Sequence, residues 1–256
     1  MTIGRTKTKQ YRPAIAGIAC LFFLLAAMKD ETKRAEWAQK HITDVPVIMM
    51  RDPLLELLGQ TADPVPYTYE EAVKLAGHSC GAVAGAWIIT RKALEVLYPG
   101  EVPVRGQIAI EAPGAKGEWI VGVFGEIMTY ITGAAPRTGF HGSSFGKRYN
   151  RRDLLVYRDA PANTPPTEMA WIFKRIDTDA RVSVRYDLSM IQPTATPDRT
   201  RTGIKMVKGE AAPGEAKEWI EYWNARVAFI FENADSLKGF FTVTDLGPPP
   251  GPGNPR

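Results

Sequence analysis

Two helices joined by a short turn are the feature of this sequence that most restricts its fold. Thr68 and Glu71 form a capping-box pattern, in which each side chain pairs with a backbone N–H of the other residue at a helix start. The pattern predicts a helix over residues 69–75 that ends at Gly77. The tripeptide HSC follows at once, and a second helix is predicted over residues 81–98. The turn between the helices therefore carries a histidine and a cysteine.

The second helix begins with the stretch GAVAGAW, in which nearly every side chain is small, and it ends at Pro99 and Gly100. Small side chains allow another backbone to approach closely. We therefore expect this helix to lie deep inside the protein or against a partner.

The rest of the chain predicts alternating strands and helices. Residues 159–167 contain three prolines and are expected to form a loop. Gly133 is expected to cap the C-terminus of the helix predicted at 118–132. The predicted elements are strands at 104–111, 153–158, 180–186 and 240–243, and helices at 118–132 and 215–232. The residues expected on inward strand faces are Ile108, Ile110, Val182 and Val184. This order predicts a single α+β domain over residues 67–245, with a mixed sheet packed with helices, rather than a doubly wound sheet.

Helix 215–232 carries an apolar stripe at helical spacing. The stripe consists of Trp219, Ile220, Trp223, Val227 and Ile230. It is predicted to belong to the hydrophobic core rather than to a cofactor site.

The N-terminal residues 1–28 are predicted to be a signal-like or membrane-anchor segment. Basic residues precede the apolar run PAIAGIACLFFLLAAM, and charges resume after it. The pattern predicts export to the periplasm or anchoring in the inner membrane; a start at Met28, which would give a cytoplasmic product, is the alternative. Residues 29–66 are predicted to be a helical extension that ends in a proline-containing linker at 61–66, with His41 as an ordinary surface residue. The Pro/Gly-rich tail, residues 246–256, is expected to be disordered.

Charge and cysteine content exclude some classes of function. The net formal charge of +4 is spread along the 256 residues, without a dense basic run interleaved with aromatics, so nucleic-acid binding is not expected. The pairs Lys147-Arg148 and Arg151-Arg152 are expected in a solvated loop. Cys80 is the only cysteine outside the apolar run, so no intramolecular disulfide is expected in the folded part. Its thiol is a free group, a metal ligand or a buried small hydrophobe.

The turn that carries His78 and Cys80 is a candidate metal site. A helix N-terminus favours a thiolate, which is the form of cysteine that binds metals. His78 is close enough to Cys80 in sequence to bind the same metal ion. His141 lies in another glycine-rich loop and is the candidate third ligand. Two nitrogens and one sulfur with an open fourth position suit zinc, and copper or iron are also compatible. The alternative is that Cys80 is a buried small residue and His78 a cap or turn donor.

The stretch LAGHSCGAVAGAWIITRKALEVL resembles the opening motif, roughly F-H-G-H-x-C-P-G, of the FmdE-like family, which is named after a component of formylmethanofuran dehydrogenase. EIMTYITG, FGKRYNRRDLLVYR and FENADSLKGFFTV follow in the family's order, so the resemblance covers about residues 67–243. It implies an FmdE-like domain, in which His78 and Cys80 are metal ligands, and a homodimer. The first histidine of the motif falls on Ala76, so the chain resembles a divergent member, and His141 matches no ligand of the family.

The sequence thus predicts a metal-binding protein with zinc as the default metal and with His78, Cys80 and His141 as ligands. An open fourth metal position would allow metal-assisted hydrolysis or a one-carbon or redox reaction. The resemblance itself implies an accessory role and does not establish catalysis. Glu111 and Glu126 are candidates for orienting a ligating histidine, with salt-bridged carboxylates as the alternative. Two other functions stay open: a haem- or copper-holding electron-transfer module, and a metal-free structural subunit that docks through GAVAGAW. The expected partners are a second copy or a partner subunit and an unknown small molecule, with the membrane contacted only through the N-terminal segment.

Overall fold

The computed structural model describes residues 36–118, 120–144, 146–158 and 168–248. The predicted leader (1–28), most of the predicted tail and the loop at 159–167 lie outside these residues. Gln39–Arg256 form one compact unit, and the description below concerns its described residues.

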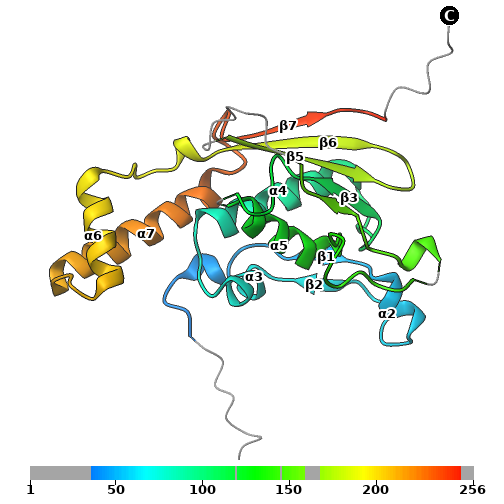
Figure 1. The fold of residues 1–256 in the computed structure, drawn as a ribbon, viewed down its shortest axis with the longest axis horizontal. Helices are drawn as coiled ribbons and strands as arrows, with labels where there is room; N and C mark the ends of the chain where they lie inside the picture. The colour runs from blue at the N-terminus through cyan, green and yellow to red at the C-terminus, as the bar shows by residue number, and fades with distance from the viewer. Residues whose placement is uncertain (1–35, 119, 145, 159–167, 249–256) are drawn as a thin grey trace, which may run out of the picture. The chain divides into compact units, whose positions relative to one another are not determined.

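A five-stranded mixed sheet organises this unit (Figure 1). Its order is β4-β3-β5-β6-β7; β3 and β4 run parallel, and the other neighbours are antiparallel. The strands are β3 (Ile108–Glu111), β4 (Leu155–Val156), β5 (Glu168–Arg175), β6 (Arg181–Asp187) and β7 (Phe241–Asp245). The prediction of an α+β fold with a mixed sheet and helices is confirmed.

One face of the sheet forms the core because its side chains alternate along each strand. On β6, Val182 and Val184 are fully buried, as predicted, and so is Tyr186. On β5, Trp171 pairs with Val184 and Phe173 pairs with Val182. Ile108 and Ile110 on β3 are also fully buried, which confirms their predicted inward face.

The helices α4 (Gly81–Leu97) and α5 (Val121–Thr132) pack against each other, and α4 packs on β5, β6 and β7. Val83, Ala84 and Trp87 of the stretch GAVAGAW are fully buried. A Cβ built on Gly85 would lie 2.3 Å from Cε1 of Tyr186, so only glycine fits there without a shift. The sheet of the same chain therefore covers this stretch, which is the interior alternative of the sequence prediction.

Residues 39–67 differ from the predicted helical extension and linker. They contain the short helices η1 (Lys40–Ile42) and α2 (Pro53–Leu57) and the strands β1 (Ile48–Met50) and β2 (Val65–Tyr67). The two strands pair antiparallel, and Met50 is fully buried. Pro66 lies in β2 and is exposed. A strand at the edge of a sheet can contain proline, which has no N–H to donate. The prolines of the predicted linker therefore belong partly to a strand.

Several predicted elements are confirmed with changed boundaries. The predicted strands at 104–111 and 153–158 are shorter, and the helix predicted at 118–132 begins at Val121. Gly77 and Gly133 both adopt the left-handed conformation that ends a helix, as expected. The remaining elements are α3 (Tyr69–Ala76), η2 (Lys147–Tyr149), η3 (Leu188–Met190), α6 (Pro197–Lys208) and α7 (Pro213–Asn233).

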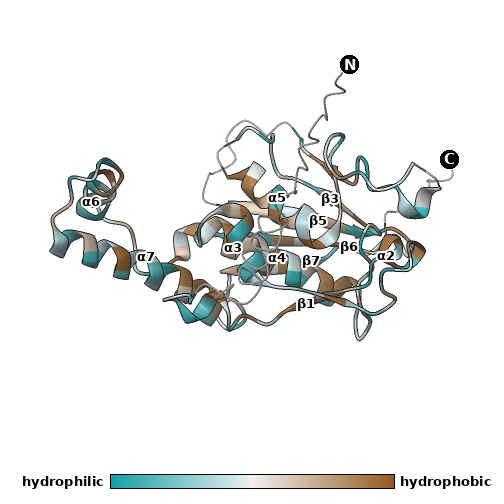
Figure 2. Ribbon diagram, turned by 90° about the horizontal axis from the view of Figure 1, so that it is seen from below, coloured by the Kyte–Doolittle hydropathy of each residue, from teal (hydrophilic) through white to brown (hydrophobic). Residues whose placement is uncertain are grey.

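The helices α6 and α7 lie side by side, and α6 with the first half of α7 stands away from the sheet in both views (Figures 1 and 2). The apolar stripe predicted on α7 is core only in its second half. Val227 and Ile230 are buried, whereas Ile220 and Trp223 are exposed, because the first half of α7 extends beyond the sheet. Among the described residues, no helix is long and apolar enough to cross a membrane.

Candidate ligand-binding cleft and the His78–Cys80 turn

The turn between α3 and α4 begins a helix, as the sequence predicts. Cys80 is the N-cap of α4 in an extended conformation, its side chain makes no capping hydrogen bond, and its thiol is buried and not in a disulfide. His78 is exposed, and its Nδ1 donates to the carbonyl oxygen of Ala76 at 3.1 Å. The two side chains therefore occupy different environments: one is buried and the other faces solvent.

His41 was expected to be an ordinary surface residue, and this expectation is wrong. Its Nε2 lies 3.4 Å from the hydroxyl of Ser79, which in turn lies 2.8 Å from the hydroxyl of Tyr69. Its ring stacks on Phe231 with a centroid separation of 6.1 Å. Burial lowers the pKa of His41 below its ordinary value, although the charge of Glu232 opposes the shift.

His141 lies in a different part of the fold from Cys80. Its Nδ1 donates to the carbonyl oxygen of Gly139 at 3.0 Å, and its ring lines a cleft of about 900 Å³. Cys80 instead lines a cavity of about 290 Å³ with Ile191 and Trp223, and these two cavities share no lining residue. The predicted third ligand and the predicted thiolate thus belong to separate sites in the structure.

The donor groups do not form a ready metal site. Among the described residues, no group of three or more His, Cys, Asp or Glu side chains could hold a metal ion. Glu111 pairs with Arg158, and Glu126 pairs with Lys116 at 2.7 Å, which is the salt-bridged alternative for both carboxylates. The structure does not bring His141 to Cys80. The zinc, copper and haem-iron hypotheses stay predictions.

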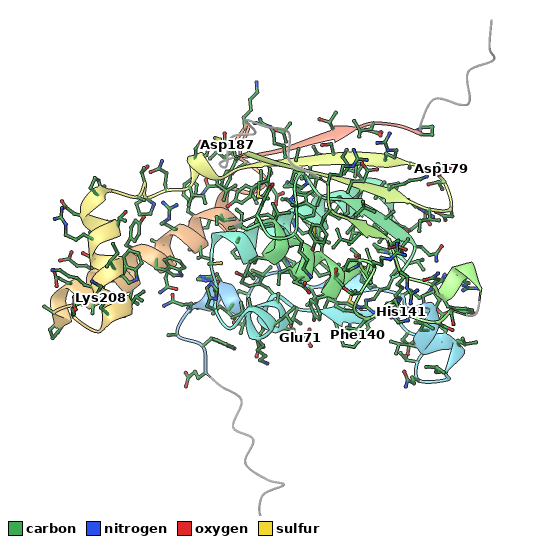
Figure 3. The ribbon with its side chains drawn as sticks, in the orientation of Figure 1. Glu71, Phe140, His141, Asp179, Asp187 and Lys208 are labelled. Carbon is green, nitrogen blue, oxygen red and sulfur yellow. The ribbon has the colours of Figure 1, made fainter. Side chains whose placement is uncertain are left out.

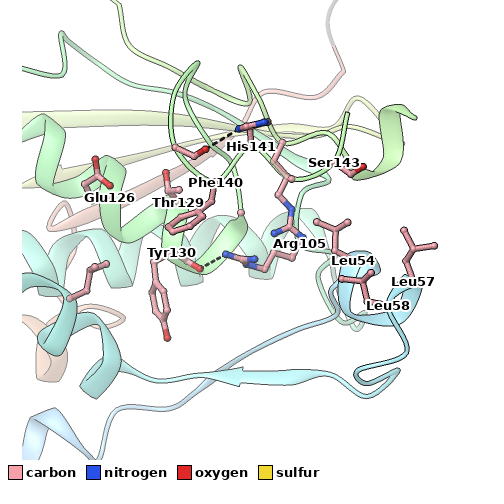
Figure 4. A pocket seen from close by; sticks show the side chains of 15 residues that line it. Leu54, Leu57, Leu58, Arg105, Glu126, Thr129, Tyr130, Phe140, His141 and Ser143 are labelled. Atoms are coloured by element: carbon pink, nitrogen blue, oxygen red, sulfur yellow. Dashed lines mark hydrogen bonds between the residues drawn. The ribbon is translucent and has the colours of Figure 1, made fainter. Parts of the chain in front are cut away.

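The cleft that contains His141 is the better-formed site (Figure 4). It lies between α2, the end of α3, α5 and the loop at 139–143. Its rim is apolar and faces solvent, with Phe140 exposed over 92% of its surface and Leu58 over 67%. Leu57 and Leu75 are exposed at the same rim. Exposed apolar side chains that gather around a concave surface are typical of a binding site.

Two arginines and one carboxylate lie beneath this rim. Asp52, only 5% exposed, is the N-cap of α2, and it accepts from Arg105 at 3.1 Å and from Arg151. Arg105 also donates to the backbone carbonyls of Ile131 and Tyr130. Both arginines line the cleft. Because the two guanidinium groups share one carboxylate, these three side chains carry a formal charge of +1.

The electrostatics of this cluster follow from burial and charge. Burial opposes ionisation of Asp52, but the N–H of Leu54 and the charges of Arg151 and Arg105 outweigh it, so the pKa of Asp52 lies below its ordinary value. Burial, and then repulsion by Arg105, lower the pKa of Arg151, although Asp52 opposes the shift. Asp52 therefore balances only one of the two guanidinium charges.

Glycines make room for these arginines. A Cβ on Gly133 would lie 2.9 Å from Cγ of Arg105, and a Cβ on Gly106 would lie 3.0 Å from Nε of Arg151. Gly142 adopts a positive φ, and its Cβ would lie 2.2 Å from the carbonyl oxygen of Tyr149. The absence of a side chain at these glycines therefore lets the backbone pack directly against Arg105 and Arg151.

Arg151 was expected in a solvated loop, and this expectation is wrong, because the residue is only 6% exposed. One sequence feature is consistent with the buried position of Arg151: Arg105 and Arg151 lie near glycines in two separate loops. That signal does not reveal the shared carboxylate, which lies 53 and 99 residues from the two arginines along the chain.

Tyr130 connects the cleft to the helix hairpin. Its hydroxyl donates to Oε2 of Glu71 at 2.6 Å, and the same oxygen accepts from the backbone N–H of Thr68 in the capping box. Burial opposes ionisation of Glu71, but the bonds from Tyr130 and Thr68 outweigh it and lower the pKa of Glu71. The start of α3 and the wall of the cleft on α5 are therefore held by one carboxylate.

A comparison of the sequence with protein-family models finds no match, and a comparison with curated proteins finds none either. The resemblance to the FmdE-like family therefore stays a prediction that rests on the quoted motifs.

Proposed function

We propose that this protein binds a small amphiphilic anion, of the aliphatic carboxylate class, in the cleft beneath Phe140. The observation that carries the proposal is the arginine pair: Arg105 and Arg151 share the single carboxylate of Asp52 at a cleft with an apolar rim. A guanidinium group pairs with a carboxylate through charge-assisted hydrogen bonds. The ligand's charged group would supply the second negative charge.

The rim supports an apolar body on the same ligand. Leu57, Leu58 and Phe140 expose apolar surface that an aliphatic chain would cover, at a gain of roughly 25 cal/mol per Å² of buried surface. The cleft volume of about 900 Å³ falls within the range of small-molecule sites. The ligand is therefore expected to need both parts, a charged head and an aliphatic chain.

Isothermal titration calorimetry of the full chain with decanoate, decanol and acetate tests this requirement. Decanoate is expected to bind at least about 10-fold more tightly than decanol, because hydrogen bonds to a charged group contribute about 1.5–3 kcal/mol. Acetate is expected to bind least well, because it lacks the chain. Equal affinity for decanoate and decanol would contradict the role of the arginines, and no binding of any probe would refute the proposed function.

A matched pair of variants locates the site. Phe140 and Val207 are equally exposed, at 92% and 91%, but only Phe140 lines the cleft. Phe140→Ala is expected to weaken decanoate binding by about 10-fold, since the ligand loses apolar contact there, whereas Val207→Ala should leave it unchanged. Equal effects of the two changes would place the ligand elsewhere.

The hypotheses drawn from the sequence stand beside this proposal with their own tests. Elemental analysis of the purified chain and of its His78→Ala and Cys80→Ala variants tests the metal site, and a visible absorption band would indicate haem or copper. The alternative of a subunit that docks through GAVAGAW has little support, because that stretch packs on the sheet of the same chain. Mass spectrometry of the mature N-terminus tests export, anchoring or a cytoplasmic start at Met28.

A further inference from the structure

His141 lines the cleft together with the two arginines, and its ring has an unused hydrogen-bonding atom. Its Nδ1 donates to the carbonyl oxygen of Gly139 at 3.0 Å, a bond that Figure 4 draws as a dashed line. A carbonyl oxygen can only accept, so Nδ1 carries the proton, and Nε2 of the neutral ring carries a lone pair. Within the described part of the chain, Nε2 of His141 makes no hydrogen bond. The neutral imidazole therefore offers the cleft an acceptor.

Thr129, Tyr130 and Glu126 line the same cleft, but their polar atoms are engaged within the protein. The hydroxyl of Thr129 donates to a backbone carbonyl at 2.7 Å, and the hydroxyl of Tyr130 donates to a carboxylate at 2.6 Å. Glu126 is paired with a lysine at 2.7 Å. The two arginines of the cleft can only donate. His141 thus adds an acceptor to a site in which the buried charged groups are donors.

The position of His141 relates this acceptor to the charged end of a ligand. The backbone N–H of Arg151 donates to the carbonyl oxygen of His141 at 2.8 Å, and Gly142 forms an antiparallel bridge with Asn150. The segments that carry His141 and Arg151 therefore run side by side. Phe140, the preceding residue, lies on the apolar rim of the cleft. His141 is therefore placed, along the chain, between the arginine that would bind the carboxylate and the aromatic ring that would contact the aliphatic chain.

We propose that the cleft preferentially binds a hydroxylated aliphatic carboxylate, in which a hydroxyl on the second or third carbon donates to Nε2 of His141 while the carboxylate binds Arg105 and Arg151. This inference rests on the proposed function and narrows its ligand class. An unsubstituted fatty acid would cover the acceptor of His141 without pairing it, which costs free energy, whereas the hydroxyl supplies the missing bond. His141 is then a specificity-determining residue of the cleft.

Isothermal titration calorimetry of the full chain tests this preference with decanoate, the enantiomers of 2- and 3-hydroxydecanoate, and 10-hydroxydecanoate. The titrations are made at pH 8, because only the neutral ring has an acceptor nitrogen. The best-bound 2- or 3-hydroxy acid is expected to bind about 5-fold more tightly than decanoate, which is the effect of one neutral hydrogen bond. 10-Hydroxydecanoate should bind no more tightly than decanoate, because its hydroxyl lies at the far end of the chain from the carboxylate.

Two variants of His141 test whether the acceptor causes the preference, which is measured as the dissociation constant of decanoate divided by that of the best-bound hydroxy acid. His141→Phe keeps a ring but removes the acceptor, so this ratio is expected to fall to about 1. His141→Gln keeps an acceptor oxygen and should give a ratio above that of His141→Phe. Val207→Ala, which lies outside the cleft, should keep the wild-type ratio. Circular dichroism checks that each variant is folded.

The outcomes separate this inference from the proposed function. Binding of decanoate without any preference for the 2- or 3-hydroxy acids would overturn the inference and leave the proposed function standing. A preference that persists in His141→Phe, or an equal gain from 10-hydroxydecanoate, would also overturn it. If none of the acids binds, the proposed function and the inference are both refuted.

Discussion

The hairpin of α6 and the first half of α7, residues 196–224, is called the arm, and it carries an apolar groove lined by Ile204, Val207, Trp219 and Trp223. The cleft and the arm each have one apolar side chain that is almost fully exposed, Phe140 and Val207, yet their charges are arranged in opposite ways. In the cleft, Arg105, Arg151 and Asp52 are largely buried and converge on one point with a net charge of +1. In the arm, the charged groups lie at the surface, four of the five basic residues pair with a carboxylate, and the residues carry no net charge. Figure 3 labels Phe140 and His141 at one side of the view and Lys208 at the other.

This difference separates two kinds of recognition. A buried, incompletely balanced charge favours a small ligand of the opposite sign, because the low dielectric strengthens the interaction and few water molecules compete. Exposed and balanced charges around an apolar groove favour a protein surface, where they set orientation more than affinity. The exposed fraction of Phe140 or Val207 alone would not distinguish the two regions.

The largest expected effect comes from removing the carboxylate of the cleft. Asp52→Ala leaves two largely buried guanidinium groups without their shared partner, and we expect the free energy of unfolding to fall by about 3–5 kcal/mol. Urea denaturation measures this loss. Asp198→Ala in the arm, where the side chain is 86% exposed, is the control and should change stability by less than about 0.5 kcal/mol. A loss below about 1 kcal/mol for Asp52→Ala would show that the cleft charges are solvated like those of the arm.

The acid dependence of stability sharpens the same contrast. The folded pKa of Asp52 lies below its ordinary value, so the stabilisation from its ionised form is complete above the unfolded pKa of about 3.9 and is lost as the pH falls through the folded pKa. Unfolding free energies measured between pH 5 and pH 2 should therefore fall less steeply in Asp52→Ala than in wild type. Parallel curves for the two proteins would contradict the assigned role of this carboxylate.

The smallest expected effect lies in the arm. Glu218→Ala removes the exposed pair with Arg199, and exposed pairs contribute about 0.2–1 kcal/mol. We expect a change below about 0.5 kcal/mol in the free energy of unfolding, measured by urea denaturation. A loss comparable to that of Asp52→Ala would mean that the arm is held by its charges.

Sequence patterns predicted the helices well where their ends are set by neighbouring residues. The capping box at Thr68 and Glu71 is present, and Gly77 ends the helix as expected. The small-sided helix α4 and the long helix α7 were also predicted, because the Pro99 and Gly100 stop of α4 and the apolar spacing of α7 are local features of the sequence. The strand β6 followed from its own alternation.

Two elements were missed although each carries a local signal. In β5, Met169, Trp171 and Phe173 alternate as buried residues, but they follow directly on a proline-rich stretch. The helix α6 begins with Thr196 as N-cap and Pro197 in the first turn, yet it buries no side chain and so shows no core stripe. The strands β1 and β2 were interpreted as helix and linker, because a two-stranded sheet of three-residue strands shows too few alternations to detect.

Local residues decided where α3 begins and ends, because its capping box and Gly77 act over three or four residues. Tertiary structure decided which polar groups meet. It joined Asp52 to Arg105 and Arg151 across 53 and 99 residues, brought His41 to Ser79 across 38, and placed His141 away from Cys80. Such contacts depend on how the sheet and helices pack, and packing is set by the whole apolar core rather than by the spacing of any motif.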